Sequence, residues 1–85
     1  MVRDGDFVAV FHSVHRIMEA EKILKSGGAE ILLIPVPRQL SSDCGLAIRF
    51  ADAERGRVEA VLAESGLRPA ELYRREVEGY VRVPV

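Results

Sequence analysis

The stretch that decides the fold of this chain is Ile34-Pro-Val-Pro-Arg-Gln-Leu-Ser-Ser-Asp-Cys-Gly-Leu-Ala-Ile-Arg49. It joins two apolar runs, Glu30–Ile34 and Leu46–Phe50, that are each typical of a β-strand. Its two prolines fix their own φ and push the neighbouring residues toward extended geometry. Gly45 lets the backbone bend, or lets a ligand come close, beside the only cysteine of the chain. The stretch therefore predicts two strands joined by a constrained loop.

Upstream of this stretch, the chain predicts a strand followed by a helix. Phe7–Phe11 is a continuous apolar run of strong β formers, which indicates a central strand covered on both faces. Ser13 is a good N-cap for a helix over Val14–Ser26, in which apolar residues recur at helical spacing. Gly27-Gly28 is expected to end this helix.

Downstream, the pattern predicts a strand, a helix and a hairpin. Leu46–Phe50 alternates, so one face of this strand is expected to be packed and the other more open. Asp52 is predicted to cap a second helix, Ala53–Ser65. Leu72–Val77 and a short fifth strand, Tyr80–Val83, are predicted to pair across a turn.

The order β-α-β-β-α-β, followed by a short strand, predicts an α+β fold. It is typical of a ferredoxin-like sandwich, an antiparallel sheet with two helices on one face. Residues 1–85 are expected to form a single domain. In this topology the Pro35–Cys44 loop lies at the same end of the sheet as His12 and the N-terminus of the first helix.

Composition excludes several classes of function. A formal net charge of −1 removes the electrostatic footprint that non-specific nucleic-acid binding needs. Leu46 and Ile48 stand where an RNA-recognition motif would present stacking aromatic rings, so RNA binding is rejected. The apolar runs are too short to cross a bilayer, and the N-terminus has no signal-peptide core, so a cytoplasmic location is expected. A single cysteine forms no internal disulfide.

Cys44 is the candidate reactive residue. A thiolate is favoured near cations and near a helix N-terminus, whose free N–H groups carry partial positive charge. Asp43 opposes this activation, because a neighbouring carboxylate disfavours the thiolate. The residues predicted to bind around Cys44 are Arg38, Ser41, Ser42, Gly45, Ser13, His15 and Lys22.

Structural interpretations compete with this one. Cys44 could be a small buried hydrophobe at the start of a strand. Arg38 could be a solvated loop residue, and Ser41-Ser42 could serve local hydrogen bonding in a turn. A metal site could be assembled from four ligand-type residues, but a His-x-x-His spacing across a strand-to-helix junction is not an established one, so no metal is predicted. Those four residues are His12, His15, Asp43 and Cys44.

Several segments occur in the order found in a known family: Phe11-His-Ser13, Ala20-Glu-Lys22, Leu24-Lys25, Ile34-Pro-Val-Pro-Arg38, Ser41-Ser42 and Cys44-Gly-Leu-Ala-Ile-Arg49. Over roughly residues 7 to 76, the chain resembles the small bacterial domain family described as putative selenium/sulfur carrier-like. The resemblance implies that Cys44 is the carrier residue, with Arg38 and Ser42 beside it. The chain departs from the family pattern at Ile17-Met18, where such sequences tend to have a small residue.

The leading hypothesis is a cytoplasmic accessory protein that carries sulfur or selenium. Cys44 as a thiolate would accept a sulfane sulfur, become a persulfide and pass the sulfur to a partner, while Arg38 stabilises the anion. Its partners would be proteins that donate or accept sulfur or selenium. No nucleic acid, membrane or cofactor is expected, and a carrier fits better than a stand-alone enzyme.

The alternative is a module of another class, which binds an anion or another protein. In that case Arg38 and the loop backbone would bind the ligand, and Cys44 would only be packed. A third hypothesis is a subunit that acts only in a complex, which the small size and the apolar tail Val81–Val85 favour. The sequence leaves open the donor, the acceptor, the choice between sulfur and selenium, and the oligomeric state.

Overall fold

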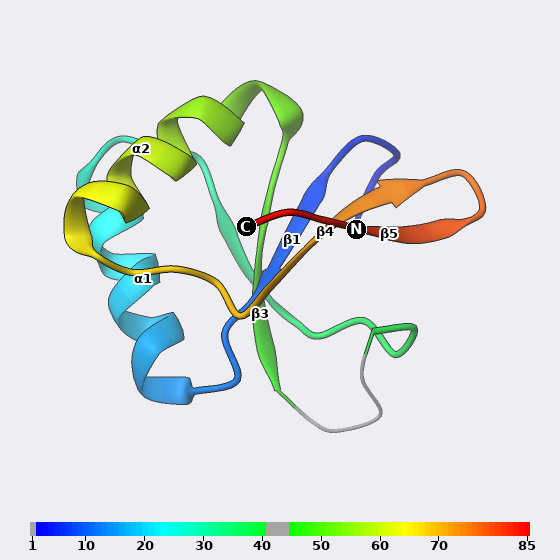
Figure 1. The fold of residues 1–85 in the computed structure, drawn as a ribbon, viewed down its shortest axis with the longest axis horizontal. Helices are drawn as coiled ribbons and strands as arrows, with labels where there is room; N and C mark the ends of the chain where they lie inside the picture. The colour runs from blue at the N-terminus through cyan, green and yellow to red at the C-terminus, as the bar shows by residue number, and fades with distance from the viewer. Residues whose placement is uncertain (1, 41–44) are drawn as a thin grey trace.

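The computed structural model describes residues 2–40 and 45–85 (Figure 1). The elements of these residues are, in chain order, β1 Phe7–Val10, α1 Val14–Ser26, β2 Leu32–Pro35, β3 Leu46–Phe50, the 3₁₀ turn η1 Asp52–Glu54, α2 Arg55–Ser65, β4 Glu71–Glu76 and β5 Gly79–Val83. The strands form one sheet in the order β2-β3-β1-β4-β5, and every neighbouring pair is antiparallel. The α+β, ferredoxin-like prediction is confirmed, with β5 added at one edge.

Both helices cover the same face of the sheet (Figure 1). β1 is the central strand and is buried along its whole length, as its apolar run predicts. Phe7 of β1 stacks on Phe50 of β3 with ring centroids 5.4 Å apart. Ile17 and Leu24 of α1 are buried against the same core, because helical spacing places them on one side of the helix.

A smaller apolar cluster lies on the other face of the sheet. Its buried members are Val8, Val10, Ile34 and Ala47, and Val2, Val36, Leu40, Tyr73 and Tyr80 pack against it. The loop that follows β2 contributes two of these side chains and lies on the side of the sheet away from the helices (Figure 1). This set is called the open-face cluster below. Because the open-face cluster covers the second face of the sheet, β1 is buried on both faces, and each of its residues is apolar.

The second helix begins differently from the prediction, which was wrong about Asp52. The amide of Glu54 donates to the carbonyl of Ala51 at 2.9 Å, and the amide of Arg55 donates to the carbonyl of Asp52. These are the N–H groups that an Asp52 cap would have bound, and a tight backbone turn takes them instead. Neither η1 nor α2 has a side-chain cap.

Strand pairing brings several loops to one end of the sheet. Val10 at the end of β1 lies opposite Ala47 near the start of β3 and opposite Glu71 at the start of β4. Pro35 at the end of β2 pairs with Leu46. We call this end, marked by the Val10, Pro35, Leu46 and Glu71 positions, the site end. The start of α1 follows β1 here, which confirms the predicted topology for the described residues.

Candidate functional site

Three of the predicted binding residues lie on α1 or at its start. Ser13 is the N-cap, as predicted, and its Oγ accepts a hydrogen bond from the amide of Arg16 at 3.2 Å. His15 lies in the first turn of α1 and is exposed, and Lys22 is exposed two turns further along. The Ser13 hydroxyl therefore already serves the helix, while the other two side chains face solvent.

The proline-rich loop leaves the sheet and returns to it at the site end. The amide of Val36 donates to the carbonyl of Gly45 at 3.0 Å, which extends the β2–β3 pairing by one step. The amide of Leu40 donates to the carbonyl of Pro37 at 3.0 Å and closes a turn that contains Arg38. Arg38 and Gly45 are both exposed. Ser41, Ser42, Asp43 and Cys44 lie outside the described residues, so their predicted roles stay predictions.

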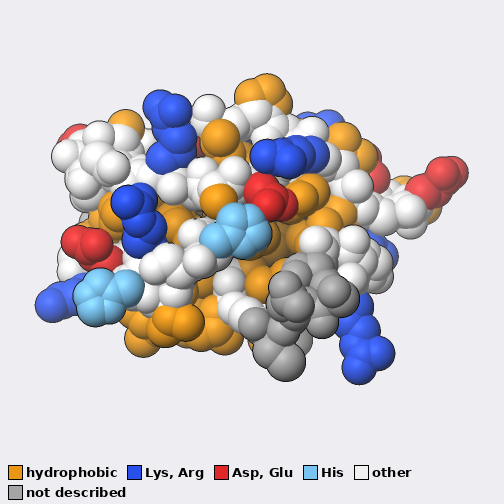
Figure 2. All heavy atoms as spheres, turned by 60° about the horizontal axis from the view of Figure 1, so that its bottom comes forward, with side chains coloured by type: hydrophobic (Ala, Val, Ile, Leu, Met, Phe, Trp, Pro, Cys, Tyr) orange, Lys and Arg blue, Asp and Glu red, His pale blue; other side chains and the backbone are white. Residues whose placement is uncertain are grey.

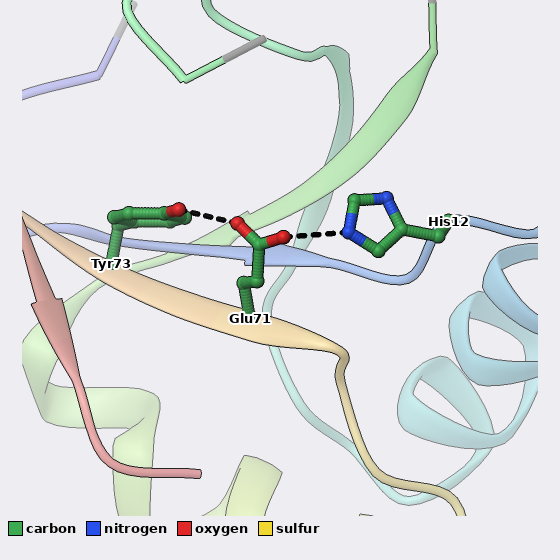
Figure 3. A network of polar contacts seen from close by, with 3 residues as sticks. All are labelled: His12, Glu71 and Tyr73. Carbon is green, nitrogen blue, oxygen red and sulfur yellow. Dashed lines mark hydrogen bonds and ion pairs between the residues drawn. The ribbon is translucent and has the colours of Figure 1, made fainter.

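The structure adds a polar network at the site end that the sequence did not predict. Nε2 of His12 lies 2.6 Å from Oε2 of Glu71, and the hydroxyl of Tyr73 donates to Oε1 of the same carboxylate (Figure 3). Glu71 and Tyr73 stand two positions apart on β4, so they project from the same face of the strand. The carboxylate thus has one donor on each oxygen.

The hydrogen bonds of this network shift the pKa values of Glu71 and Tyr73 in opposite directions. The hydrogen bond from Tyr73, followed by the one from His12, lowers the pKa of the Glu71 carboxyl below its ordinary value of 4.5, against a smaller opposing effect of burial. The bond to Glu71 raises the pKa of Tyr73 above its ordinary value of 10.0. Near neutral pH Glu71 is therefore an anion that only accepts hydrogen bonds. It follows that Nε2 of His12 donates the proton in its contact with Glu71.

His12 holds its ring in this position with an unusual backbone. Its φ is 56°, and it is the one residue other than glycine with a positive φ in the described part of the chain. Histidine adopts this left-handed region more often than most residues, but the conformation still costs free energy. The bend lets the chain turn from β1 into α1 while the imidazole lies over the start of β4 (Figure 3). Its side chain remains 59% exposed.

The face around the network carries both apolar and basic side chains (Figure 2). Figure 2 shows the site end, where a histidine and an acidic side chain meet at the surface among apolar side chains. Tyr73 connects the network to the open-face cluster, against which its ring packs. A small cavity of about 330 Å³ lies further along the same face; Val2, Ile34, Pro35, Val36, Pro37, Gln39, Arg75 and Tyr80 line it. The guanidinium of Arg75 covers the Tyr80 ring at 5.0 Å.

A larger, apolar cavity of about 540 Å³ lies on the helix face instead. Val58 and Leu62 of α2, Leu72 of β4 and Val85 of the C-terminal tail contribute to its lining. None of His12, Glu71 and Tyr73 lines it. Its lining includes two charged residues, Glu59 and Arg68, but none of the residues that the sequence predicts to bind.

Residues 2–40 and 45–85 contain neither a cluster of metal-ligating side chains nor a helix that could span a membrane. No three His, Cys, Asp or Glu side chains in these ranges gather closely enough to hold a metal ion. Neither α1 nor α2, the α-helices of these ranges, has the length and apolar character that crossing a bilayer requires.

Sequence reasoning missed Glu71 and Tyr73 because their partner is distant in the chain. The prediction began the fourth strand at Leu72, whereas β4 starts one residue earlier, at Glu71. His12 and Glu71 are 59 positions apart, and only the β1–β4 register brings them together. The available signal was a Glu-x-Tyr alternation at the start of a strand, which carries no information about its partner.

Comparison with known proteins gives a family. Residues 6–74 match the model of the family described as "Putative Se/S carrier protein-like". No curated protein and no solved structure matches the chain.

Proposed function

Because this chain belongs to the family described as "Putative Se/S carrier protein-like", we propose that it carries sulfur or selenium on Cys44. In the loading step, the Cys44 thiolate attacks the outer sulfur of a donor persulfide, R–S–SH. A bond forms between Sγ and that sulfur, the S–S bond of the donor breaks, and the donor leaves as a thiolate. The sulfur moves from one thiol to another, so no external oxidant or reductant is needed.

The observation that carries this proposal, beside the family, is the position of the loop ends. Gly45, which follows the predicted carrier segment, pairs with Val36 at the end of the sheet where α1 begins, and Leu40, which precedes the segment, closes a turn with Pro37 in the same loop. The N-terminus of α1 contributes partial positive charge at this end, and a thiolate or persulfide anion is stabilised by such charge. Arg38 is exposed in the turn that precedes the segment and adds a cation within reach of an incoming anion.

Direct mass measurement tests the proposal. The protein is incubated with a low-molecular-weight persulfide donor, and its intact mass is recorded before and after treatment with a thiol reductant. We expect a gain of one sulfur atom that the reductant reverses. Cys44→Ser should keep the fold and lose the gain, because a hydroxyl of similar size cannot form the persulfide. Sulfur uptake by Cys44→Ser equal to that of the parent protein would contradict the proposal.

A second candidate function is a module that binds a small anion. This candidate is supported by the cavity that Pro35 of β2, Pro37 and Gln39 of the loop, and Arg75 of β4 line. The cation at this cavity is Arg75, and the predicted Arg38 does not line it. Alkylation separates the two functions. A carrier thiol should react quickly with iodoacetamide in the folded protein at neutral pH, whereas a packed cysteine should react only on unfolding.

A further inference from the structure

The sheet ends in two edge strands, β2 and β5, which differ in how they are protected. An edge strand presents unpaired N–H and C=O groups to any other strand, and proteins block such edges with prolines, charges or bulges. β2 ends in Pro35, and Pro37 follows two residues later. β5, Gly79–Val83, is one residue longer, contains neither a proline nor an acidic residue, and carries one charge, on Arg82. Among the described strands, β5 is thus the edge that is open to pairing.

The turn before β5 determines which of its backbone groups face outward. Residues 77–78 form a two-residue turn, and Glu76 pairs with Gly79 across it. The pair that closes a two-residue hairpin is hydrogen bonded, and such pairs alternate along an antiparallel ladder. The N–H and C=O groups of the first, third and fifth residues of β5 therefore face β4, whereas those of Tyr80 and Arg82 face away from it. In residues 2–40 and 45–85, no backbone hydrogen bond outside the helices and strand ladders involves Tyr80 or Arg82.

The side chains of β5 alternate between the two faces of the sheet. On the open face, Tyr80 packs against the open-face cluster, and the guanidinium of Arg75 lies 5.0 Å from the centroid of its ring. Arg82 is exposed on the same face, opposite Tyr73 of β4. On the helix face, Val81 is 46% exposed, and the β4–β5 hairpin extends away from both helices (Figure 1). The outer edge of the sheet therefore carries an aromatic ring, a cation and an uncovered valine.

We propose that a second copy of this chain pairs with β5 edge to edge, so that the two five-stranded sheets form one sheet across a twofold axis at Val81. The two β5 strands run antiparallel, and Tyr80 of each copy lies opposite Arg82 of the other. This pairing matches the backbone, because both residues of each such pair present their N–H and C=O groups outward and exchange two hydrogen bonds. The interface does not involve Cys44 and does not depend on the chemistry proposed for it.

Complementary side chains identify the second copy as the partner. On the open face, one row across both sheets alternates ring and cation: Tyr73, Arg82, Tyr80 of the second copy and Arg75 of the second copy. Each guanidinium in the row lies next to a ring, an attraction that Arg75 and Tyr80 already show within one copy. On the helix face, the two Val81 side chains meet at the axis and cover each other. The same patch thus serves both copies, as a twofold interface requires.

Other registers of this edge are less favourable. With the axis at Arg82, two like charges lie opposite each other, and Tyr80 lies opposite Pro84, which has no N–H. With the axis at Tyr80, Arg82 lies opposite Glu78, which belongs to the turn and not to β5. An axis between two residues pairs an outward-facing residue with an inward-facing one, so no hydrogen-bonded pair forms. The axis at Val81 is the one that uses the whole of Gly79–Val83.

Sedimentation over a range of protein concentrations tests whether the dimer exists. The 85-residue chain is measured from about 1 μM to about 1 mM, with reductant present so that Cys44 cannot link two chains. A contact along one five-residue strand is small beside the roughly 1,200–2,000 Å² that stable interfaces bury, so we expect a reversible dimer. Within this range the mass should rise from that of one chain toward twice that mass. The mass of a single chain at every concentration would overturn the inference.

Arg82→Pro is the variant that blocks the edge. Because the N–H of Arg82 faces outward, a proline there removes no hydrogen bond between β4 and β5 but removes a donor that the dimer needs. We expect this variant to stay a monomer where the parent protein is a dimer, with the unfolding midpoint of the parent monomer. Arg82→Ala keeps the N–H and removes only the cation, so it should raise the dissociation constant about tenfold. Arg16→Ala, which removes an exposed charge from α1, should leave the dissociation constant unchanged.

Cysteine cross-linking measures the register directly. In a Cys44→Ser background, Val81→Cys places the single cysteine of the chain at the proposed axis. Opposite residues that are not hydrogen bonded have Cα atoms about 4.5 Å apart, within the range that a disulfide spans. Mild oxidation should therefore link two chains through Val81→Cys at least about tenfold faster than through Val77→Cys in the same background. Val77 is the stricter control because it is more exposed than Val81, 80% against 46%.

The variants distinguish edge pairing from any other arrangement. If the parent protein dimerises and Arg82→Pro dimerises equally well, the dimer uses another surface and the inference is wrong. Cross-linking of Val77→Cys as fast as that of Val81→Cys would contradict the twofold axis. If Arg82→Pro does not fold, the cross-linking rates decide, because Val81→Cys leaves every outward-facing N–H of β5 in place.

Discussion

Val10 and Glu71 are register partners at the site end of the sheet, and this pairing sets the Glu71 carboxylate beside the ring of His12. The backbone of Val10 is held on both sides, by β3 and by β4. The position of His12, two residues later, is therefore fixed by the centre of the sheet. A flexible loop would not set the same geometry, since a hydrogen-bonded strand end moves less than a loop.

Ile17 and Met18 provide a direct test of which side of α1 holds the core. Ile17 is 2% exposed and Met18 is 47% exposed, although they are neighbours in the chain. Ile17→Ala should lower the free energy of unfolding by about 2–5 kcal/mol, because it removes buried methyl groups and leaves a cavity. Met18→Ala is the matched control, expected to stay within about 0.5 kcal/mol. Denaturant titration measures both, and equal losses would contradict the packing described here.

Tyr73→Phe should weaken the fold in a way that depends on pH. The loss of the bond to Glu71 should cost about 1 kcal/mol near neutral pH. The folded-state pKa of Glu71 lies below 4.5, so this contribution is present above pH 4.5 and disappears as the pH falls through the folded-state value. The folded-state pKa of Tyr73 lies above 10.0, so on the alkaline side the contribution is present below pH 10.0 and is lost above it.

Urea titrations of the parent protein and Tyr73→Phe at several pH values measure this difference. Tyr80→Phe is a suitable control, because Tyr80 packs against the same open-face cluster. A difference between the parent protein and Tyr73→Phe that stays constant from neutral pH to pH 3 would show that the Glu71 bond is not its cause.

The fold was predictable wherever local chemistry determines it. The bounds of α1 follow from the Ser13 cap and the glycines after Ser26, and those of β3 from its alternation. The prediction that the Asp52 side chain caps α2 was wrong, because the backbone carbonyls of a 3₁₀ turn accept the hydrogen bonds of the Glu54 and Arg55 amides. The amino-acid sequence does not show whether a side chain or a backbone carbonyl accepts these bonds. The site divides in the same way. The cysteine segment is visible as a motif, whereas the His12–Glu71 contact depends on strand register and cannot be found from spacing.

Arg38→Ala tests the electrostatic part of the carrier proposal. If Arg38 stabilises the thiolate of Cys44, the variant should be alkylated more slowly near neutral pH, and the difference should vanish at alkaline pH, where the thiolate forms unaided. The free energy of unfolding should change by less than about 1 kcal/mol, because the side chain is exposed. Arg68→Ala, which removes a charge from an exposed side chain after α2, is the control. An unaltered pH profile for alkylation would assign Arg38 to another role.

Gly66 ends α2 in the left-handed conformation, with φ 71°. A Cβ added there would meet nothing within 4 Å, so a substitution is expected to act through the backbone alone. Gly66→Ala should cost about 1–2 kcal/mol of the free energy of unfolding. Gly66→Asn should cost less, because asparagine is the next most common residue at this cap. Thermal and denaturant unfolding of the two variants measure the difference; a larger loss for Asn than for Ala would point to a contact instead.

The central place of β1 in the sheet also bears on how the protein is made. Phe7 pairs with Phe50 on one side and with Arg74 on the other, so β1 is synthesised well before either of its partner strands. In a chain leaving the ribosome, one edge of β1 stays open until β3 emerges and the other until β4 emerges. Helix α1 can form early from local contacts, whereas the sheet must wait for distant ones. Translation speed and chaperone occupancy should therefore affect the yield of folded protein more than a length of 85 residues suggests.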